Sequence, residues 1–304
     1  MKLKVFFLLI CAMILITGCV EKGVVGISGG EFNIELNDTE ITTSSSTAVI
    51  DGSKITITSA GNYNITGKLT DGQIIVDAAK TEVNLILNNV DITCSDNAPI
   101  YILSAKNAFI TVTEGTTNTF TDGTKYTYLN AGDTEPNATI FSKADLTIRG
   151  LGVLNVKANY HNAIASKDSL IIENADITAD AKNNGIKGKD FLVINNSTIN
   201  VTAGNDGIKS TNDKETDGGY VALTDSIITI TAVDEAIQAI ENVTIKGGTL
   251  NIDTRNNGIK TPKTIDLQSG TITIKTLDDA FAAESLIGTN DANITVNGTK
   301  YNLQ

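Results

Sequence analysis

Apolar and polar positions alternate along most of the chain, and one short phrase recurs between the alternating runs. Each phrase has two polar residues, a glycine or alanine, and then an isoleucine or phenylalanine. Its second polar residue recurs after 22, 22, 29, 22 and 22 residues. A fixed period of this size predicts a stacked solenoid, with one loop inserted at the longer step. The second polar residues are Asn162, Asn184, Asp206, Glu235, Asn257 and Asp279.

A second motif keeps the same period and marks a bend in each repeat. An alternating run such as 170–174 ends at the bend, and another run such as 176–179 follows it. Apart from a final serine, the bend residues are types that tolerate positive φ well. Each repeat is therefore expected to contain two or three short strands, with an isoleucine pointing into a shared core. The bend residues are Asn174, Asn196, Asp225, Gly247 and Ser269.

The chain divides into three parts. Residues 1–18 have the pattern of a lipoprotein signal peptide, because Lys2 and Lys4 precede an apolar run that leads into a lipobox ending at Cys19. The run 5–16 is shorter than the roughly 20 residues of a spanning helix. We expect lipidation of Cys19, a linker over 19–31, and one domain over 32–304. The only membrane contact is then a lipid anchor on the outer face of the cell membrane.

Composition excludes some functions. The sequence has no Trp, which rules out a tryptophan platform for sugar binding. The formal net charge is −12, and removal of the signal peptide makes it −14. So acidic a chain does not bind nucleic acid by neutralising phosphates. A long polar excursion over 116–137 interrupts the repeats, and its aromatic residues, Tyr126 among them, predict an ordered loop.

Acidic residues in the repeated phrases predict a metal site. Residues one repeat apart stack at about 4.8 Å in a parallel solenoid. At that spacing Asp206 repels Asp234 or Glu235 by on the order of 3 kcal/mol at an effective dielectric near 20, which invites a cation. The inserted loop adds Asp213 and Asp217 nearby in sequence. Oxygen ligands of this kind suit Ca²⁺. The alternative is that these acids are solvated turn residues, while asparagines in the same column are structural.

Lysines form a second column, after the core isoleucine. Lys187, Lys209 and Lys260 are either paired with neighbouring carboxylates such as Asp206, or they form a basic stripe suited to an acidic polysaccharide. Tyr160 and Tyr220 are candidate sugar-stacking rings. His161, the only histidine, is a further candidate contact beside Tyr160, although a lone histidine on a turn is often incidental.

Segments 126–150, 159–164 and 204–210 resemble the clostridial carbohydrate-binding β-helix family of surface proteins. The resemblance covers nearly all of the mature chain, and 137–150 is its most specific part. It implies a right-handed parallel β-helix similar to pectate lyases. Together with the 22-residue period and the irregular strands over 32–81, which we interpret as an N-terminal cap, the expected fold is a right-handed single-stranded parallel β-helix with about 22 residues per coil. It also implies bound calcium and affinity for cellulose and acidic plant polysaccharides, without established catalysis. The phrases at 161–163, 183–185 and 256–258 lack the family's usual acid, so metal is best supported around 206–235.

The sequence therefore predicts a monomeric, non-catalytic binder of polysaccharide at the cell surface, assisted by calcium. One alternative is a calcium-dependent polysaccharide lyase in which Lys187 or Lys209 abstracts the proton alpha to a uronate carboxylate. Another is a structural spacer or adhesin, for which the regular repeat is sufficient.

Overall fold

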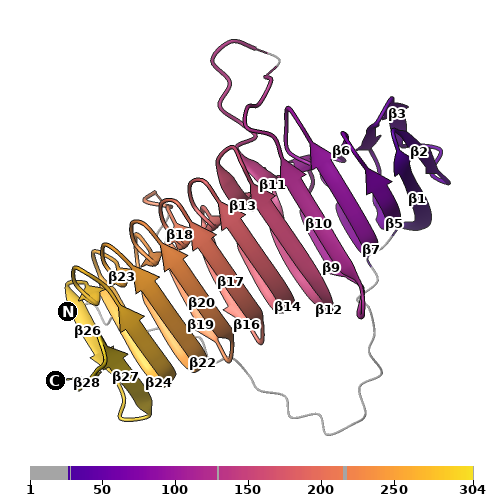
Figure 1. Cartoon of the computed structure of the whole chain (residues 1–304). Coiled ribbons are helices and arrows are strands. Elements are labelled where there is room, and N and C mark those ends of the chain that lie inside the picture. Colours follow the sequence, from indigo (N-terminus) through magenta and orange to yellow (C-terminus); the bar gives the residue numbers. More distant parts are fainter. Residues whose placement is uncertain (1–26, 28, 129, 215–217, 304) are drawn as a thin grey trace, which may run out of the picture.

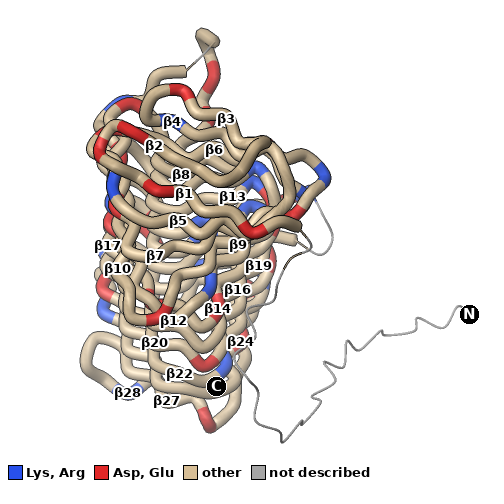
Figure 2. Tube along the Cα trace, turned by 90° about the vertical axis from the view of Figure 1, so that its right-hand side faces the viewer, with Lys and Arg blue, Asp and Glu red and all other residues tan. Residues whose placement is uncertain are grey.

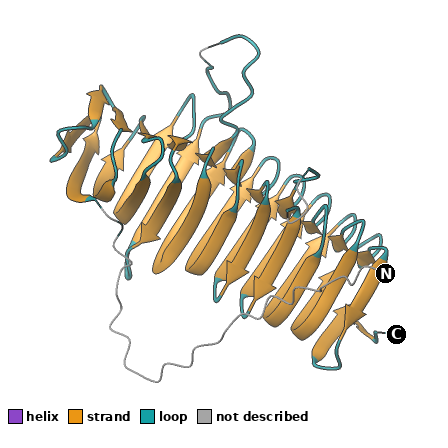
Figure 3. Cartoon of the chain, turned by 180° about the vertical axis from the view of Figure 1, so that it is seen from behind, coloured by secondary structure: helices purple, strands orange, loops and turns teal. Residues whose placement is uncertain are grey.

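The computed structural model of the chain describes residues 27, 29–128, 130–214 and 218–303. These residues form strands stacked side by side along one direction, joined by loops (Figures 1 and 3). In this part of the chain there is no helix of the length and hydropathy needed to cross a membrane. The predicted signal peptide and Cys19 lie outside the described residues.

The larger of two sheets has 17 strands. Among the described residues its pairs are parallel, except for β1 with β2 at one end and β27 with β28 at the other. Its strands are β1 (Gly30–Asp38), β2 (Glu40–Thr43), β5 (Gly61–Leu69), β7 (Glu82–Cys94), β9 (Asn107–Val112), β10 (Thr117–Asp122), β12 (Asp145–Ala158), β14 (Leu170–Ala181), β16 (Phe191–Asn195), β17 (Thr198–Ala203), β19 (Tyr220–Thr224), β20 (Ile227–Ala232), β22 (Val243–Thr254), β24 (Thr264–Lys275), β26 (Ser285–Gly288), β27 (Ala292–Val296) and β28 (Thr299–Tyr301).

The smaller sheet has 11 strands, and its order follows the sequence from one end to the other. Its pairs in the described part of the chain are parallel, apart from an antiparallel pair of β3 with β4. Its strands are β3 (Val49–Asp51), β4 (Lys54–Ile57), β6 (Gln73–Asp77), β8 (Ile100–Ser104), β11 (Ala138–Ser142), β13 (Asn162–Ser166), β15 (Ile186–Gly188), β18 (Ile208–Ser210), β21 (Ile237–Gln238), β23 (Ile259–Lys260) and β25 (Phe281–Ala282).

The core lies between the two sheets, and the repeated isoleucine faces it as the sequence predicts. Successive copies are direct partners in the smaller sheet, beginning with Ile164 opposite Ile186 and Ile186 opposite Ile208. The five isoleucines have no exposed surface. Burial of one such side chain contributes about 1.5–3 kcal/mol. The complete column is Ile164, Ile186, Ile208, Ile237, Ile259 and Phe281.

The predicted fold class is wrong in one respect. The chain is all-β, but it is not a single-stranded solenoid of uniform coils. Strand β14 pairs with β16 through its first half and with β17 through its second half. Strand β22 does the same with β19 and β20. Because β16 also pairs with β19, and β17 with β20, these six parallel strands form a closed circuit beside the second sheet. The 22-residue period of the sequence indicates which residues of successive repeats are paired. It does not show with how many other strands each strand pairs.

The predicted bends are confirmed at four of five positions. The backbone φ is 50° at Asn174, 48° at Asn196, 46° at Asp225 and 77° at Gly247. In the last of these repeats the left-handed conformation falls on Gly270 (φ 109°), immediately after the serine at the predicted position. Asparagine, aspartate and glycine adopt this conformation at lower cost than other residues, which fixes the bend at the same place in each repeat.

Asn196 gives a clean test of this backbone constraint, because its side chain is exposed. Replacing Asn196 by alanine should lower the free energy of unfolding by about 1 kcal/mol, since alanine disfavours positive φ. The matched variant Asn196→Gly should lose little or none. Denaturant unfolding of both variants and the wild type measures the difference, and equal losses in the two variants would contradict the backbone explanation.

The longest loop in the described part of the chain spans residues 123–137, apart from residue 129, and rises from the stack near β11 (Figure 1). It is shorter than the predicted excursion because β10 takes up residues 117–122. Its base is held by Asp122, which is buried and accepts hydrogen bonds from the hydroxyl of Tyr126 (2.8 Å) and from the backbone NH of Asn159. The ring of Tyr126 stacks on Tyr160 at a centroid distance of 4.4 Å.

Candidate functional site

Outward-facing residues of the smaller sheet form one continuous line, which we call the outer column. They alternate with the core isoleucines, so they point away from the core. Each is the direct strand partner of the next. The first half of the column is apolar or aromatic and the second half is mostly lysine. Its members are Ile75, Tyr101, Phe141, Ala165, Lys187, Lys209, Gln238 and Lys260.

A buried ladder of polar side chains runs beside the core, as predicted for the asparagine column. The amide of Asn184 donates to Asn162 Oδ1 at 2.9 Å, and Asn162 donates to the carbonyl of Asn137 at 2.9 Å. Further along, the amide of Asn257 donates to Glu235 Oε1 at 3.3 Å. Between Asp206 and Glu235, however, both side chains are carboxylates. An ionised carboxylate only accepts hydrogen bonds, so this step of the ladder has a side-chain donor only when one of the two carboxyl groups is protonated.

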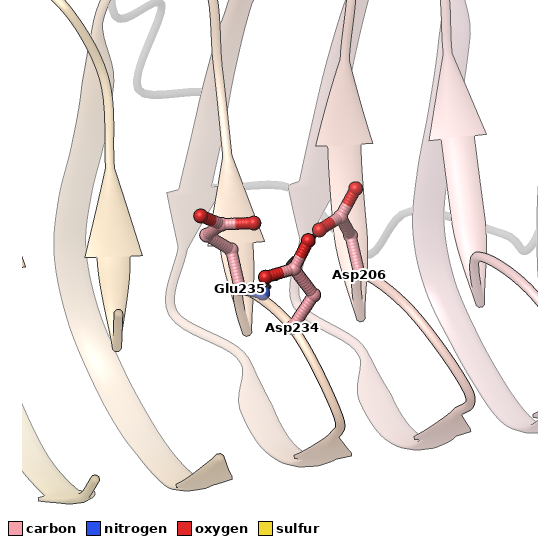
Figure 4. Close-up of side chains that lie close together, drawn as sticks. All are labelled: Asp206, Asp234 and Glu235. Atoms are coloured by element: carbon pink, nitrogen blue, oxygen red, sulfur yellow. Dashed lines mark hydrogen bonds between the residues drawn. The ribbon is translucent and has the colours of Figure 1, made fainter. Parts of the chain in front are cut away.

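Asp206, Asp234 and Glu235 form an acidic cluster, in which one carboxylate oxygen of each lies within 4.8 Å of the others (Figure 4). Asp206 precedes β18, while Asp234 and Glu235 precede β21, so the stacking of these strands brings the acids together. Asp206 is fully buried and Glu235 is 3% exposed. Lys209 Nζ lies 2.5 Å from Asp206 Oδ2, and Lys260 Nζ lies 2.6 Å from Glu235 Oε1.

The two buried carboxylates titrate differently. Burial raises the pKa of Asp206, with Glu235 adding to the effect and Lys209 opposing it. Burial acts in the same direction on Glu235, but hydrogen bonds with Lys260, Asp206 and Asp234 outweigh it and bring its pKa to about 2. The pair therefore binds a proton or a cation between its carboxylates more readily than two separate acids would. Oxygen ligands at this spacing are compatible with a divalent cation.

Lys187 differs from the other lysines of the column. Lys209 and Lys260 are paired with acids of the cluster, as the first of the two interpretations expected. Lys187 is half-buried, and no carboxylate of the described residues forms an ion pair with it. Burial lowers its pKa, and the nearby charges of Lys209 and Lys167 lower it further. A small pocket of about 170 Å³, lined by residues that include Lys167, Lys187 and Lys189, adjoins it.

The remaining residues predicted to contact sugar do not all lie together: Tyr160 and His161 are neighbours, and Tyr220 is in the other sheet. One face of the Tyr160 ring is covered by Tyr126, and His161 lies beside it at a centroid distance of 6.1 Å. Both ring nitrogens of His161 are within 3.3 Å of the amide of Asn183, and burial lowers its pKa. Tyr220 belongs to the larger sheet and stacks on Phe191 at 5.0 Å, so it is not on the outer column.

Of the predicted loop ligands, Asp213 is exposed and does not join the acidic cluster, and Asp217 lies outside the described residues. Charge of both signs occurs along the whole length of the stack (Figure 2). The acidic cluster is thus distinguished by its burial and spacing rather than by an excess of acid on one face.

Sequence reasoning missed Tyr101, Lys143 and Glu135. Tyr101 and Phe141 are neighbours in the outer column, with ring centroids 5.9 Å apart. Glu135, from the loop, forms an ion pair with Lys167 and lies 3.8 Å from the ammonium of Lys143. The aromatic residues of the loop indicated an ordered segment. Because the loop contains no repeat, the sequence does not show which strands it contacts.

Glu235 gives a prediction for acid stability. Its folded pKa is depressed to about 2 from an ordinary value of 4.5. Its ionised form therefore stabilises the fold fully above pH 4.5, and this contribution is lost as the pH falls toward 2. Glu235→Gln should lower the free energy of unfolding by up to about 3 kcal/mol at pH 6. In denaturant unfolding, the difference in free energy of unfolding between wild type and variant should become smaller from pH 6 to pH 3. A difference that does not change with pH would contradict the depressed pKa of Glu235.

Comparison with known proteins places this arrangement in a family. A family model described as "Carbohydrate-binding domain-containing protein" matches residues 51–302. A protein of that name from Acetivibrio thermocellus is 41% identical over 252 residues, which is 81% of this chain and 88% of the relative. A solved gadolinium derivative of the polysaccharide lyase-like protein from C. thermocellum is 30% identical, with a TM-score of 0.73, and the match covers 87% of this chain and 99% of that one. The chain belongs to the family of carbohydrate-binding domain-containing proteins.

Proposed function

We propose that this protein binds acidic polysaccharide, without catalysis, along the lysine half of the outer column. The observation that carries the proposal is Lys187, a half-buried ammonium group that forms no ion pair with a carboxylate of the described chain. A partly desolvated cation gains more from an incoming anion than a fully hydrated one does. Membership of a carbohydrate-binding family supports a sugar carboxylate as that anion.

The shape of the column suits a polymer. Its residues stand on successive parallel strands, at a spacing of roughly 4.8 Å, so the same kind of contact recurs along a line. Lys187, Lys209 and Lys260 share this line, with Gln238 between the last two. A uronate chain presents carboxylates in a similar row. Several weak contacts along one polymer then act together.

We further propose that calcium binds at the acidic cluster. The ladder step between Asp206 and Glu235 lacks a side-chain donor when both acids are ionised, and a cation then supplies the missing positive charge. Asp206, Asp234 and Glu235 would each contribute an oxygen ligand, leaving the remaining positions of a six- to eight-coordinate ion to other oxygens. The ion would take over the neutralising role of Lys209 and Lys260 and leave their ammonium groups available to the polymer. Calcium assists binding in this way without contacting the sugar itself.

The place of action remains a proposal from the sequence. A lipid on Cys19 would hold the domain at the outer face of the cell membrane, with residues 19–31 as the spacer. The outer column would then be presented to polysaccharide outside the cell.

A second candidate function is a uronate lyase. The lowered pKa of Lys187 favours it, because a lysine acts as a general base only when neutral. The position of Arg149 argues against it. Arg149 belongs to the larger sheet, where its guanidinium group lies 4.9 Å from the ring of Phe109. It is therefore not beside the lysines of the smaller sheet, where a carbanion would need stabilisation.

Polymer retention in affinity gels separates these functions. Wild type should be retarded by polygalacturonate without releasing unsaturated product. Lys187→Ala should weaken the retardation about tenfold or more, the value of one charge-assisted contact. Lys275→Ala is the matched control, since Lys275 is 73% exposed and lies in β24 of the larger sheet. Unsaturated product that Lys187→Ala abolishes would establish the lyase instead, and no retention at all would leave a structural spacer.

Thermal unfolding tests the calcium site. At free calcium of about 100 times the dissociation constant, wild type should gain about 2.7 kcal/mol and roughly 5–10 °C in melting temperature over the chelated sample. Asp206→Asn should remove this calcium response, because it takes away the fully buried ligand. The chelated variant should remain folded, since an amide restores a donor to the ladder. Indifference of the wild type to calcium and chelator would refute the site.

A further inference from the structure

Three further lysines form a short column beside the outer column, and we call them the flanking lysines. Lys143, Lys167 and Lys189 directly follow the paired strands β11, β13 and β15. Strand pairing continues past the last two, because their backbone NH groups donate to carbonyls of the preceding repeat. The flanking lysines therefore stand on three successive repeats, next to the lysine half of the outer column. Lys189 has a carboxylate partner in the adjacent Asp190, at 3.2 Å.

A carboxylate from the long loop lies against the other two flanking lysines. Glu135 forms an ion pair with Lys167 and lies 3.8 Å from the ammonium group of Lys143. It lines the small pocket of about 170 Å³ beside Lys187. On its other side it lines a groove of about 760 Å³ beside Tyr101. An acid of the chain itself thus occupies a basic site that adjoins the proposed polymer contact.

The contacts of Glu135 are open to exchange with an anion from solvent. The side chains of Lys143 and Lys167 are 38% and 46% exposed, and that of Glu135 is 25% exposed. Ion pairs as accessible as these contribute little to stability, because water hydrates the separated charges nearly as well. A second carboxylate that approaches Lys167 therefore replaces Glu135 at little cost in free energy.

Glu135 also acts on Lys187, although the two form no ion pair. Burial and the charges of Lys209 and Lys167 lower the pKa of Lys187, and the carboxylates of Asp206 and Glu135 oppose this effect. An anionic polymer that approaches Lys187 meets the negative charge of Glu135 at the same pocket. At such short range, salt screens the repulsion between the two anions only in part.

We propose that Glu135 is an internal ligand of the flanking lysines, which an acidic polymer displaces when it binds across Lys167 and Lys187. The proposal rests on the function proposed above and adds regulation to the same site. At Lys167 the polymer exchanges one carboxylate for another, so only the contact with Lys187 is a net gain. The loop carboxylate thereby lowers the affinity of the lysine half for polyanions.

Glu135→Gln tests the internal ligand, because it removes the charge and keeps the size of the side chain. In affinity gels with polygalacturonate, this variant should bind about three- to tenfold more tightly than wild type, since one exposed ion pair and one repulsion are removed. Asp133→Asn is the matched control. It removes the same charge from the same loop, but Asp133 accepts hydrogen bonds from Asn130 and forms no ion pair with a lysine of the described chain.

A double-mutant cycle separates an internal ligand from a loop anchor. Lys167→Ala should change retardation little in the wild-type background, where the polymer only replaces Glu135. In the Glu135→Gln background, the same change should weaken retardation about threefold or more, because Lys167 is then free to make a net contact. Thermal unfolding of each variant checks that the fold is kept.

The outcomes distinguish this proposal from the proposed function. If wild type is retarded and Glu135→Gln is not retarded more strongly, or if Asp133→Asn gains as much, the internal ligand is overturned and polysaccharide binding stands. An effect of Lys167→Ala that is equal in both backgrounds also overturns it. Retardation of Glu135→Gln alone would support it in its strongest form. If neither wild type nor Glu135→Gln is retarded, both proposals are refuted together.

Discussion

The rest of the structure depends on main-chain pairing in a fixed register between successive repeats. Strands β13 to β23 of the smaller sheet each hydrogen-bond to the equivalent strand before and after them, so a residue lies next to its counterpart in the neighbouring repeat. Side chains at equivalent positions therefore form columns. A residue type that occurs once in each repeat forms a continuous line along the sheet. The isoleucine core, the polar ladder and the outer column all follow from this constraint.

This constraint also explains what the sequence can predict. The isoleucines and the bend residues recur with the same period as the strand pairing. The individual residues of both columns could therefore be predicted. The closed circuit of β14, β16, β19, β22, β20 and β17 was not, because it arises from two halves of long strands, which no period records. The sheet to which Tyr220 belongs was not predictable for a related reason. The spacing shows that it follows the insertion but not which sheet receives it.

The acidic cluster was predictable in part for the same reason. Asp206 and Glu235 occupy positions where three of the other repeats have asparagine, and their proximity follows from register alone. Their pairing with Lys209 and Lys260 depends on side-chain conformations, which register does not determine. Lys260 also has asparagine in its own repeat, but it reaches Glu235 of the preceding repeat. Lys187 stands apart because its own repeat and the preceding one both have asparagine in the ladder, Asn184 and Asn162. Asparagine in place of an acid in the ladder thus leaves a lysine of the neighbouring outer column without a carboxylate partner.

The position of Glu135 has a further consequence for how the long loop is attached to the stack. Glu135 comes from the loop, and it lines both the groove beside Tyr101 and the small pocket beside Lys187. It forms an ion pair with Lys167, which follows β13, and lies 3.8 Å from the ammonium group of Lys143, which follows β11. One loop carboxylate thus contacts lysines of two neighbouring repeats, so a single side chain anchors the end of an insertion that has no strand of its own in either sheet.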